Sequence, residues 1–253
     1  MVVAATVVVA GAVTGFSRAQ DPVRPSEVVV AATDPAPAEV SGAWTATAVS
    51  ATPTSFTVAD AAGPTVRLFE APDVPLASKP SMDNPTHEGL AVVFLVLEED
   101  GPWLKVRVSS RPNHLVAWVL RSEVTLRTVK NRIVVEVGAR RATVYHGDDV
   151  LLETVVAVGT EATPTPLGEF FVDGVVKVPY DTGPYGAYQV SVSGFSEVLH
   201  SFSGGNGQIA LHGTNRPDLL GQPVSNGCVR MDNAAITSMA WLAPTGTPVQ
   251  IVA

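Results

Sequence analysis

The chain has 253 residues, of which 46% are hydrophobic and 16% charged, with 21 Gly, 20 Pro and one Cys. This length predicts one or two domains with a substantial hydrophobic core. A single Cys excludes an intrachain disulfide and a zinc site built from several cysteines. The formal net charge is -8, and neither half of the chain has an excess of basic residues, so no nucleic-acid partner is expected.

The N-terminal segment has the composition of an export signal. Residues 2–13 are uncharged and almost all Val, Ala or Gly, and the first basic residue is Arg18. This run is too short to span a bilayer and resembles the apolar part of a secretory signal, although no basic segment precedes it. A buried strand is the alternative. We predict that residues 1–19 are a signal peptide or membrane anchor, which implies export to the cell envelope, and that the Pro-, Ala- and Thr-rich residues 20–58 are a linker.

A first folded module is predicted over residues 59–126. Short β-type runs at residues 91–97, 103–108 and 116–120 are separated by turn signals, and this spacing favours a small β-barrel. The segment around Trp103 and Trp118 resembles a bacterial SH3-like wall-associated module. The resemblance implies contact with wall glycan or peptide, but the two Trp residues are equally well explained as core aromatics.

The remaining residues, 127–253, are also predicted to be mainly β. Apolar and polar residues alternate after Asn131, and a hairpin turn is expected at residues 146–149. The one clear helical segment is 233–242, capped by Asp232 or Asn233, and a final strand is expected at residues 247–252. The fold class is therefore mainly β, with one or two short helices.

Two segments in this region carry the candidate chemistry. An apolar run ends in His212-Gly213, and sixteen positions after the His comes Cys228, preceded by Ser225-Asn226-Gly227. A free thiol with a pKa near 8.5 is little ionised at neutral pH, so a reactive Cys needs an imidazole nearby to accept its proton. Ser-Asn-Gly allows a tight turn whose N–H groups form an oxyanion site. An inert buried thiol is the alternative, but the turn-forming neighbours favour a reactive one.

These motifs resemble the YkuD-type L,D-transpeptidase catalytic domain, a β-sandwich that remodels bacterial peptidoglycan. The family pattern of His-Gly, then Ser or Thr, His, Gly, Cys, an apolar residue and Arg matches residues 212–213 and 225–230. The upstream Thr-Pro-x-Gly-x-Phe pattern matches residues 165–170, and the closing strand matches residues 246–249. The resemblance covers residues 129–252, about half of the chain. One departure is Asn226, where the family usually has His.

The resemblance implies a role for each matched residue. Cys228 would be the nucleophile and His212 the general base, with the Gly213 carbonyl orienting the imidazole. Ser225, Asn226 and Gly227 would form the oxyanion or substrate-binding region. Arg230 would bind a stem-peptide carboxylate or brace the loop through a salt bridge. No metal site and no cofactor are expected.

The implied reaction is peptidoglycan L,D-transpeptidation. Cys228 would form a thioester with a stem peptide, release D-alanine, and transfer the acyl group to an amine. Two alternatives remain. One is a carboxypeptidase or endopeptidase that uses water as the acceptor. The other is an inactive wall-binding protein, which is possible because Asn226 replaces the usual His of the family. The Gly-rich loop with Tyr180, Tyr185 and Tyr188 is either a lid over the acyl site or an ordinary surface loop.

Overall fold

The computed structural model describes residues 52–202 and 204–253. All of them belong to one compact unit, residues 49–253. The predicted signal or anchor at residues 1–19 lies outside the described residues, as does the predicted linker up to residue 51. Among the residues that are described, no helix is long and apolar enough to cross a membrane.

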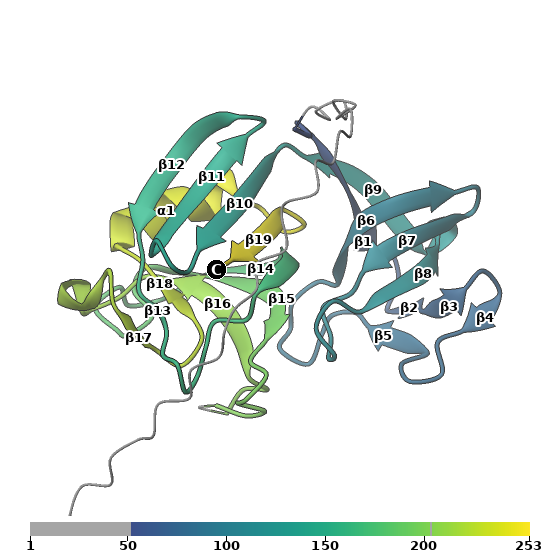
Figure 1. Ribbon diagram of the computed structural model, residues 1–253. Helices are drawn as coiled ribbons and strands as arrows, with labels where there is room; N and C mark the ends of the chain where they lie inside the picture. The colour runs from purple at the N-terminus through teal and green to yellow at the C-terminus, as the bar shows by residue number, and fades with distance from the viewer. Residues whose placement is uncertain (1–51, 203) are drawn as a thin grey trace, which may run out of the picture. The chain divides into compact units, whose positions relative to one another are not determined.

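Residues 56–129 form an N-terminal module around a seven-stranded sheet with strand order β4-β3-β8-β7-β6-β1-β9, drawn in blue and teal in Figure 1. Its first strand begins three residues before the predicted boundary at residue 59. The strands are β1 (Phe56–Ala61), β2 (Thr65–Arg67), β3 (Phe69–Ala71), β4 (Val74–Pro75), β5 (Ser81–Asp83), β6 (Val93–Asp100), β7 (Trp103–Arg107), β8 (Val116–Leu120) and β9 (Val124–Val129), with a 3-10 turn at Arg121–Glu123 and β2 paired to β5 in a separate ribbon.

Alternating side chains build the core of this module. On β7, Leu104 and Val106 are fully buried, as the period of two along a strand requires. Trp103 is also buried and meets Phe69 edge-on with the ring centroids 4.9 Å apart, so it is a core aromatic. Trp118 is partly exposed, and the Lys105 ammonium lies 5.7 Å from its ring centroid. The SH3-like character of the module stays a prediction.

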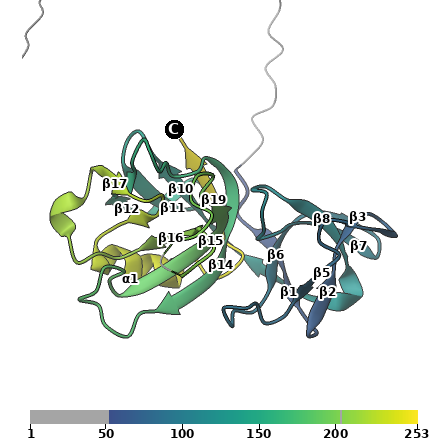
Figure 2. The same ribbon diagram turned by 90° about the horizontal axis from the view of Figure 1, so that it is seen from below.

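Residues 130–253 form a C-terminal domain around an eight-stranded sheet with strand order β12-β11-β10-β19-β14-β15-β16-β18. Figure 2 shows β14, β15 and β16 as neighbours in this sheet. The strands are β10 (Asn131–Glu136), β11 (Arg141–His146), β12 (Asp149–Val155), β13 (Val158–Gly159), β14 (Gly168–Lys177), β15 (Tyr188–Phe195), β16 (Gln208–His212), β17 (Pro223–Ser225), β18 (Val229–Arg230) and β19 (Pro248–Val252), with β13 and β17 paired separately and a 3-10 turn at Pro217–Leu219.

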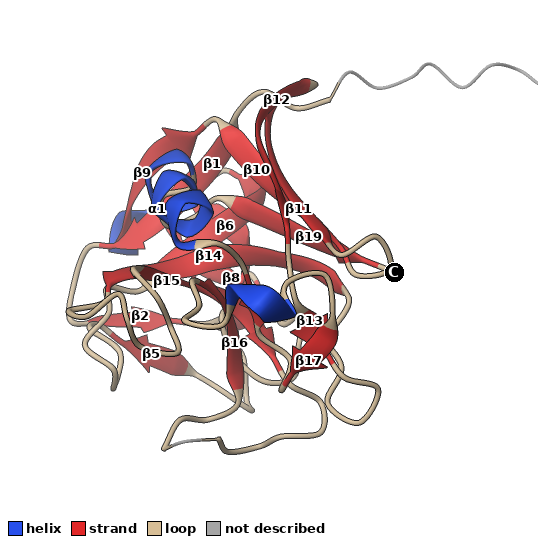
Figure 3. Cartoon of the chain, turned by 90° about the vertical axis from the view of Figure 1, so that its left-hand side faces the viewer, coloured by secondary structure: helices blue, strands red, loops and turns tan. Residues whose placement is uncertain are grey.

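The helix α1 (Asn233–Leu242), blue in Figure 3, packs against this sheet at β12, β15 and β16. Asp232 caps it by accepting a hydrogen bond from the Ala234 N–H at 2.8 Å. Ile236 and Met239, three positions apart, are fully buried in the core of the domain. The predicted helix and the predicted mainly β fold are therefore confirmed, and Asp232 rather than Asn233 is the cap.

The module and the domain are joined by apolar and polar contacts. Phe171 of β14 is fully buried in a cluster with four Val and Leu side chains of β1, β6 and β9. Arg127 donates to the Thr245 hydroxyl of the domain at 2.9 Å, and an ion pair with Asp60 of its own module, at 2.6 Å, holds the guanidinium in place. The Asn113 amide accepts from the Phe195 N–H and donates to its carbonyl, both at 2.8 Å. The Asn113 side chain thus satisfies both backbone polar groups of Phe195 and links the module to the domain.

Candidate active site

The pairing of β16 with β18 brings the two chemical segments together. The strands are parallel, with Leu211 opposite Val229 and His212 opposite Arg230. Residues two apart on a strand share a face, so Ala210 and His212 point to the same side. Both line a pocket of about 480 Å³ that is also lined by Cys228, and we call it the Cys228 pocket.

His212 is held by its own neighbour. Its side chain is only 3% exposed, and Nδ1 lies 2.6 Å from the Gly213 carbonyl oxygen. A carbonyl can only accept, so Nδ1 carries the proton and the Nε2 lone pair is free. Burial lowers the pKa of His212 to about 4; the Arg230 charge lowers it too, while the Gly213 hydrogen bond acts in the opposite direction. At neutral pH the imidazole is thus an uncharged proton acceptor.

Cys228 is partly buried and is a free thiol. Burial raises its pKa, while a hydrogen bond with the Ala210 backbone and the charge of Arg230 act in the opposite direction. The net effect is upward, so the resting group is a thiol and not a thiolate. The pocket therefore holds a neutral thiol and a neutral imidazole, a combination in which the base must take the proton as the sulfur attacks.

Hydrogen bonds within residues 225–228 fix the turn that precedes the thiol. Ser225 is buried; its hydroxyl donates to the Cys228 carbonyl at 2.5 Å and accepts from the Gly227 N–H at 3.1 Å. Gly227 has a φ of 113°, which L side chains rarely adopt. These two predicted site residues therefore form the turn that presents Cys228, and neither lines the pocket.

The other two predicted residues of this segment do line the pocket. Asn226 is exposed within the lining. Arg230 is partly buried, and its Nε has no hydrogen-bond partner among the described residues. No carboxylate within residues 52–202 and 204–253 forms an ion pair with it. Of the two predicted roles for Arg230, the structure therefore offers no bracing ion pair in this part of the chain.

Two features of the site were not assigned from the sequence. The Tyr185 ring meets the His212 ring edge-on, with centroids 5.1 Å apart, and lines the pocket, whereas Tyr180 is 79% exposed. Asn233 accepts from the Thr214 N–H at 3.1 Å and donates to the Asp181 carbonyl at 3.3 Å. It thus ties the Tyr-containing loop to the segment that follows His212. Its position beside the helix cap was the only sequence signal for it.

No group of three or more His, Cys, Asp or Glu side chains suited to holding a metal occurs in the described part of the chain. One pocket holds a thiol, a neutral imidazole with a fixed tautomer and a guanidinium without an ion pair among the described residues, and these residue types suit acyl transfer.

Comparison with known proteins agrees with this chemistry. Residues 130–251 match the family model of the YkuD L,D-transpeptidase catalytic domain. The chain is 36% identical over 124 residues to the L,D-transpeptidase-family protein YkuD of Bacillus licheniformis, a match that covers 49% of this chain and 67% of that one. This chain belongs to the YkuD L,D-transpeptidase family.

The chain is also similar to a second Bacillus protein and to two solved structures. YkuD of Bacillus subtilis is 35% identical over 124 residues, with 49% and 67% of the two chains covered. An Enterococcus faecium L,D-transpeptidase structure is 20% identical with a TM-score of 0.37, and the match covers 49% of this chain and 50% of that one. A Mycobacterium smegmatis L,D-transpeptidase is 15% identical with a TM-score of 0.40, with 65% and 92% covered. All seven predicted site residues lie within the YkuD family match, and the N-terminal module lies before it.

Proposed function

We propose that this protein is a peptidoglycan L,D-transpeptidase in which Cys228 is the nucleophile and His212 the general base. The single observation that carries the proposal is that both side chains line one pocket, with His212 held neutral by burial and its Nδ1 committed to the Gly213 carbonyl. The family membership supports the reaction class, and stem peptides of peptidoglycan are the substrates that this class implies.

The first half of the reaction makes a thioester. The Cys228 Sγ attacks the carbonyl carbon of the third stem residue while His212 Nε2 takes the thiol proton. The tetrahedral oxyanion is stabilised by hydrogen-bond donors, each worth about 3 kcal/mol in acyl-transfer enzymes. The C–N bond to the terminal D-alanine then breaks, and His212 returns the proton to the leaving amine.

For the oxyanion we propose the Asn226 amide and the Cys228 N–H as donors. The Gly227 N–H already donates to Ser225, so the role of Ser225 and Gly227 is to hold the turn. Arg230 fits the carboxylate of the donor stem, because a guanidinium without an ion pair binds a carboxylate strongly when solvent is limited.

The second half transfers the acyl group. A neutral amine of a second stem attacks the thioester carbon, the C–S bond breaks, and the amine's surplus proton returns to the sulfur by way of His212. Since the substrate is part of the cell wall, we also propose that the protein is exported and acts in the cell envelope.

The test is intact-protein mass spectrometry after exposure to a carbapenem, followed by incubation with purified muropeptides. We expect a single covalent adduct, D-alanine release and crosslinked dimers. The Cys228→Ala protein should form no adduct and no product while keeping its fold, and His146→Ala, which alters a histidine outside the pocket lining, should behave like the natural protein.

The outcomes separate the alternatives. Alanine loss without dimers would show hydrolysis, with water as the acceptor. An adduct that persists in Cys228→Ala would disprove the nucleophile. If the natural protein forms no adduct and leaves muropeptides unchanged, the enzyme proposal fails and a wall-binding function takes its place.

A further inference from the structure

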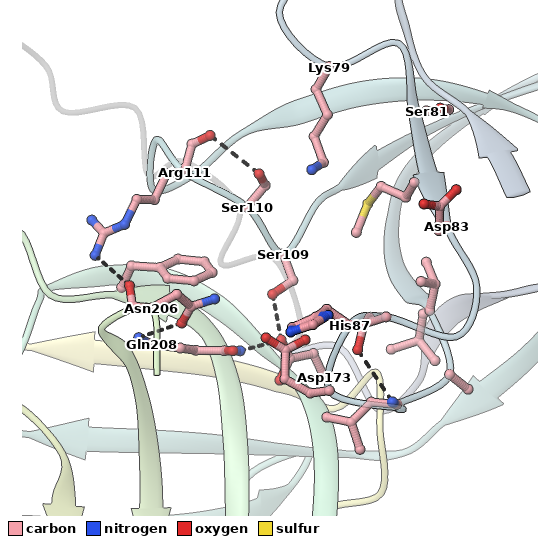
Figure 4. A pocket seen from close by; sticks show the side chains of 18 residues that line it. Lys79, Ser81, Asp83, His87, Ser109, Ser110, Arg111, Asp173, Asn206 and Gln208 are labelled. Carbon is pink, nitrogen blue, oxygen red and sulfur yellow. Dashed lines mark hydrogen bonds between the residues drawn. The ribbon is translucent and has the colours of Figure 1, made fainter. Parts of the chain in front are cut away.

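A second pocket, of about 470 Å³, lies where the N-terminal module meets the C-terminal domain. Figure 4 shows its side chains. Lys79, Asp83 and Glu88 come from the module, and Asp173, Asn206 and Gln208 come from the domain. We call it the junction pocket. The reaction proposed above leaves it without a role.

The junction pocket adjoins the Cys228 pocket. Three residues line both: Glu88, Asn206 and Gln208. Gln208 begins β16, and His212 ends the same strand. A ligand in the junction pocket would therefore reach the thioester by passing Glu88 and the start of β16.

The wall between module and domain is fixed by hydrogen bonds. The Asp173 carboxylate accepts from the Ser109 hydroxyl of the module at 2.5 Å, from the Ser191 hydroxyl at 2.6 Å and from the Gln208 amide at 2.5 Å. The Arg111 guanidinium donates to three backbone carbonyls of the domain, those of Ser196, Leu199 and Asn206. Ligand binding therefore does not have to order this wall, which lowers its entropic cost.

The charges that face the junction pocket are of both signs. Lys79 is partly exposed, and Asp83 and Glu88 are exposed. None of the three forms an ion pair within residues 52–202 and 204–253. Two further charged residues line the pocket, but the Arg111 guanidinium is bound to backbone carbonyls and the Asp173 carboxyl group is bound to polar side chains. Lys79, Asp83 and Glu88 therefore remain to pair with a ligand that carries an ammonium and a carboxylate, as an α-amino acid group does.

Transpeptidation needs such a ligand, because the acceptor must bring an amine to the thioester. The donor stem already occupies the space around Cys228 and Arg230, so the acceptor has to approach from an adjoining space. We propose that the junction pocket is the acceptor site: it binds the amino-acid end of a second stem peptide, with Glu88 holding the ammonium at the boundary and Lys79 pairing with the carboxylate. This inference rests on the proposed function and extends it to the second substrate.

The acceptor reacts through its free amine. The bound ammonium loses one proton to solvent, and the free amine attacks the thioester carbon. A C–N bond forms, the C–S bond breaks, and Cys228 recovers its thiol proton from the attacking nitrogen. Carboxylates at Glu88 and Asp83 raise the local concentration of the amine-bearing residue, and the Cys228 pocket supplies the chemistry.

The experiment measures acceptor binding and acceptor use separately. The probe is a disaccharide-tripeptide muropeptide that ends in diaminopimelate, whose free amine lies on that residue. Its affinity for the Cys228→Ala protein, measured by calorimetry, should fall about fivefold in Glu88→Gln, the scale expected for a partly exposed ion pair. Glu70→Gln, which alters an exposed Glu of the same module outside the pocket, is the matched control. Acetylation of the amine should remove the difference between the two variants.

A second experiment measures the rates of transfer and thioester formation in proteins that keep Cys228. With Glu88→Gln, the rate of transfer relative to the rate of thioester formation should fall about fivefold, with more hydrolysis, and with Glu70→Gln it should not change. Equal binding and equal partition in the two variants would overturn the acceptor site. Absence of a thioester in the natural protein would instead overturn the proposed function, and the calorimetry then decides the site independently.

Discussion

The Cys228 pocket and the junction pocket are nearly equal in volume, about 480 and 470 Å³. They differ in the solvent exposure of the titratable groups that would bind or react with a substrate. In the Cys228 pocket, burial lowers the pKa of His212 and raises that of Cys228, so both groups are neutral. In the junction pocket, Lys79, Asp83 and Glu88 are at least partly exposed and stay solvated. In the proposed reaction, the buried neutral pair transfers a proton, and the solvated charges of the junction pocket bind a charged ligand.

The largest effect is expected from a change in the buried pair of His212 and Cys228. His212→Ala should slow acylation by a carbapenem at least about a hundredfold, because the thiol loses its proton acceptor. Binding of the acceptor muropeptide should not change, since His212 does not line the junction pocket. Stopped-flow acylation and calorimetry measure the two quantities. A His212→Ala protein that acylates at the natural rate would show that another group takes the proton.

The pH dependence of acylation and of stability also tests the burial of His212. Because the pKa of His212 is lowered to about 4, the acylation rate of the natural protein should be flat through the region near pH 6.5 and fall only as pH approaches 4. The unfolded chain, with a His pKa near 6.5, binds more protons in this window. Stability should therefore fall as pH decreases from about 6.5 to 4, and His212→Ala should remove this contribution. An acid limb centred near 6.5 would contradict the burial argument.

The second prediction concerns the wall of the junction pocket. Asp173→Ala should lower the free energy of unfolding by about 2 kcal/mol, because Ser109, Ser191 and Gln208 lose their shared acceptor. Burial raises the pKa of Asp173, so the stability that it contributes is greatest at low pH and declines as pH rises through its folded pKa. Denaturant unfolding measures both, with the exposed Asp149→Ala as the control.

The neutral variant Asp173→Asn tests the predicted direction in which stability changes with pH. Asp173→Asn carries no charge, so its stability relative to the natural protein should improve as pH rises from about 4 toward neutrality. A stability difference that moves in the opposite direction would show that the ionised carboxylate is favoured in the fold.

The third prediction concerns the link between the Tyr185 loop and the base. Asn233→Ala removes the acceptor for the Thr214 N–H and the donor to the Asp181 carbonyl, so acylation should slow about tenfold through misplacement of the Gly213 segment. Asn131→Ala, which breaks an amide hydrogen bond to the Leu242 carbonyl elsewhere, should lower stability without slowing acylation. A purely structural role for Asn233 would leave the pH profile of acylation unchanged, and a positioning role would shift it.

The smallest effect is expected at Asn226. Asn226→Ala should slow acylation only about threefold, because the exposed Asn226 amide is a weak donor and the Cys228 N–H remains in place. Asn226→His should keep or raise the rate. An amide does not titrate, so no step in the pH profile should depend on this residue. If only Asn226→His reacts with a carbapenem, the natural chain is not a transpeptidase.

The sequence by itself determined the local features of this protein. The strand alternation, the capped helix at residues 233–242, the hairpin at residues 146–149 and the mainly β fold follow from nearest-neighbour patterns and agree with the structure. His212, Cys228 and their flanking residues were recognisable because the motif is short and contains the chain's single thiol. Such features depend on residues close in the chain, and their physical causes are local.

Only the tertiary structure decided what lies across from these residues. The sequence did not indicate that the Gly227 N–H is used by Ser225, that Asn233 reaches the Asp181 carbonyl, or that Asp173 gathers Ser109 and Gln208 from distant segments. The lowered pKa of His212 and the charges of the junction pocket likewise depend on burial and on neighbours far away in the chain. Desolvation and long-range hydrogen bonds are properties of packed surfaces, and packing exists only after the strands have found their partners.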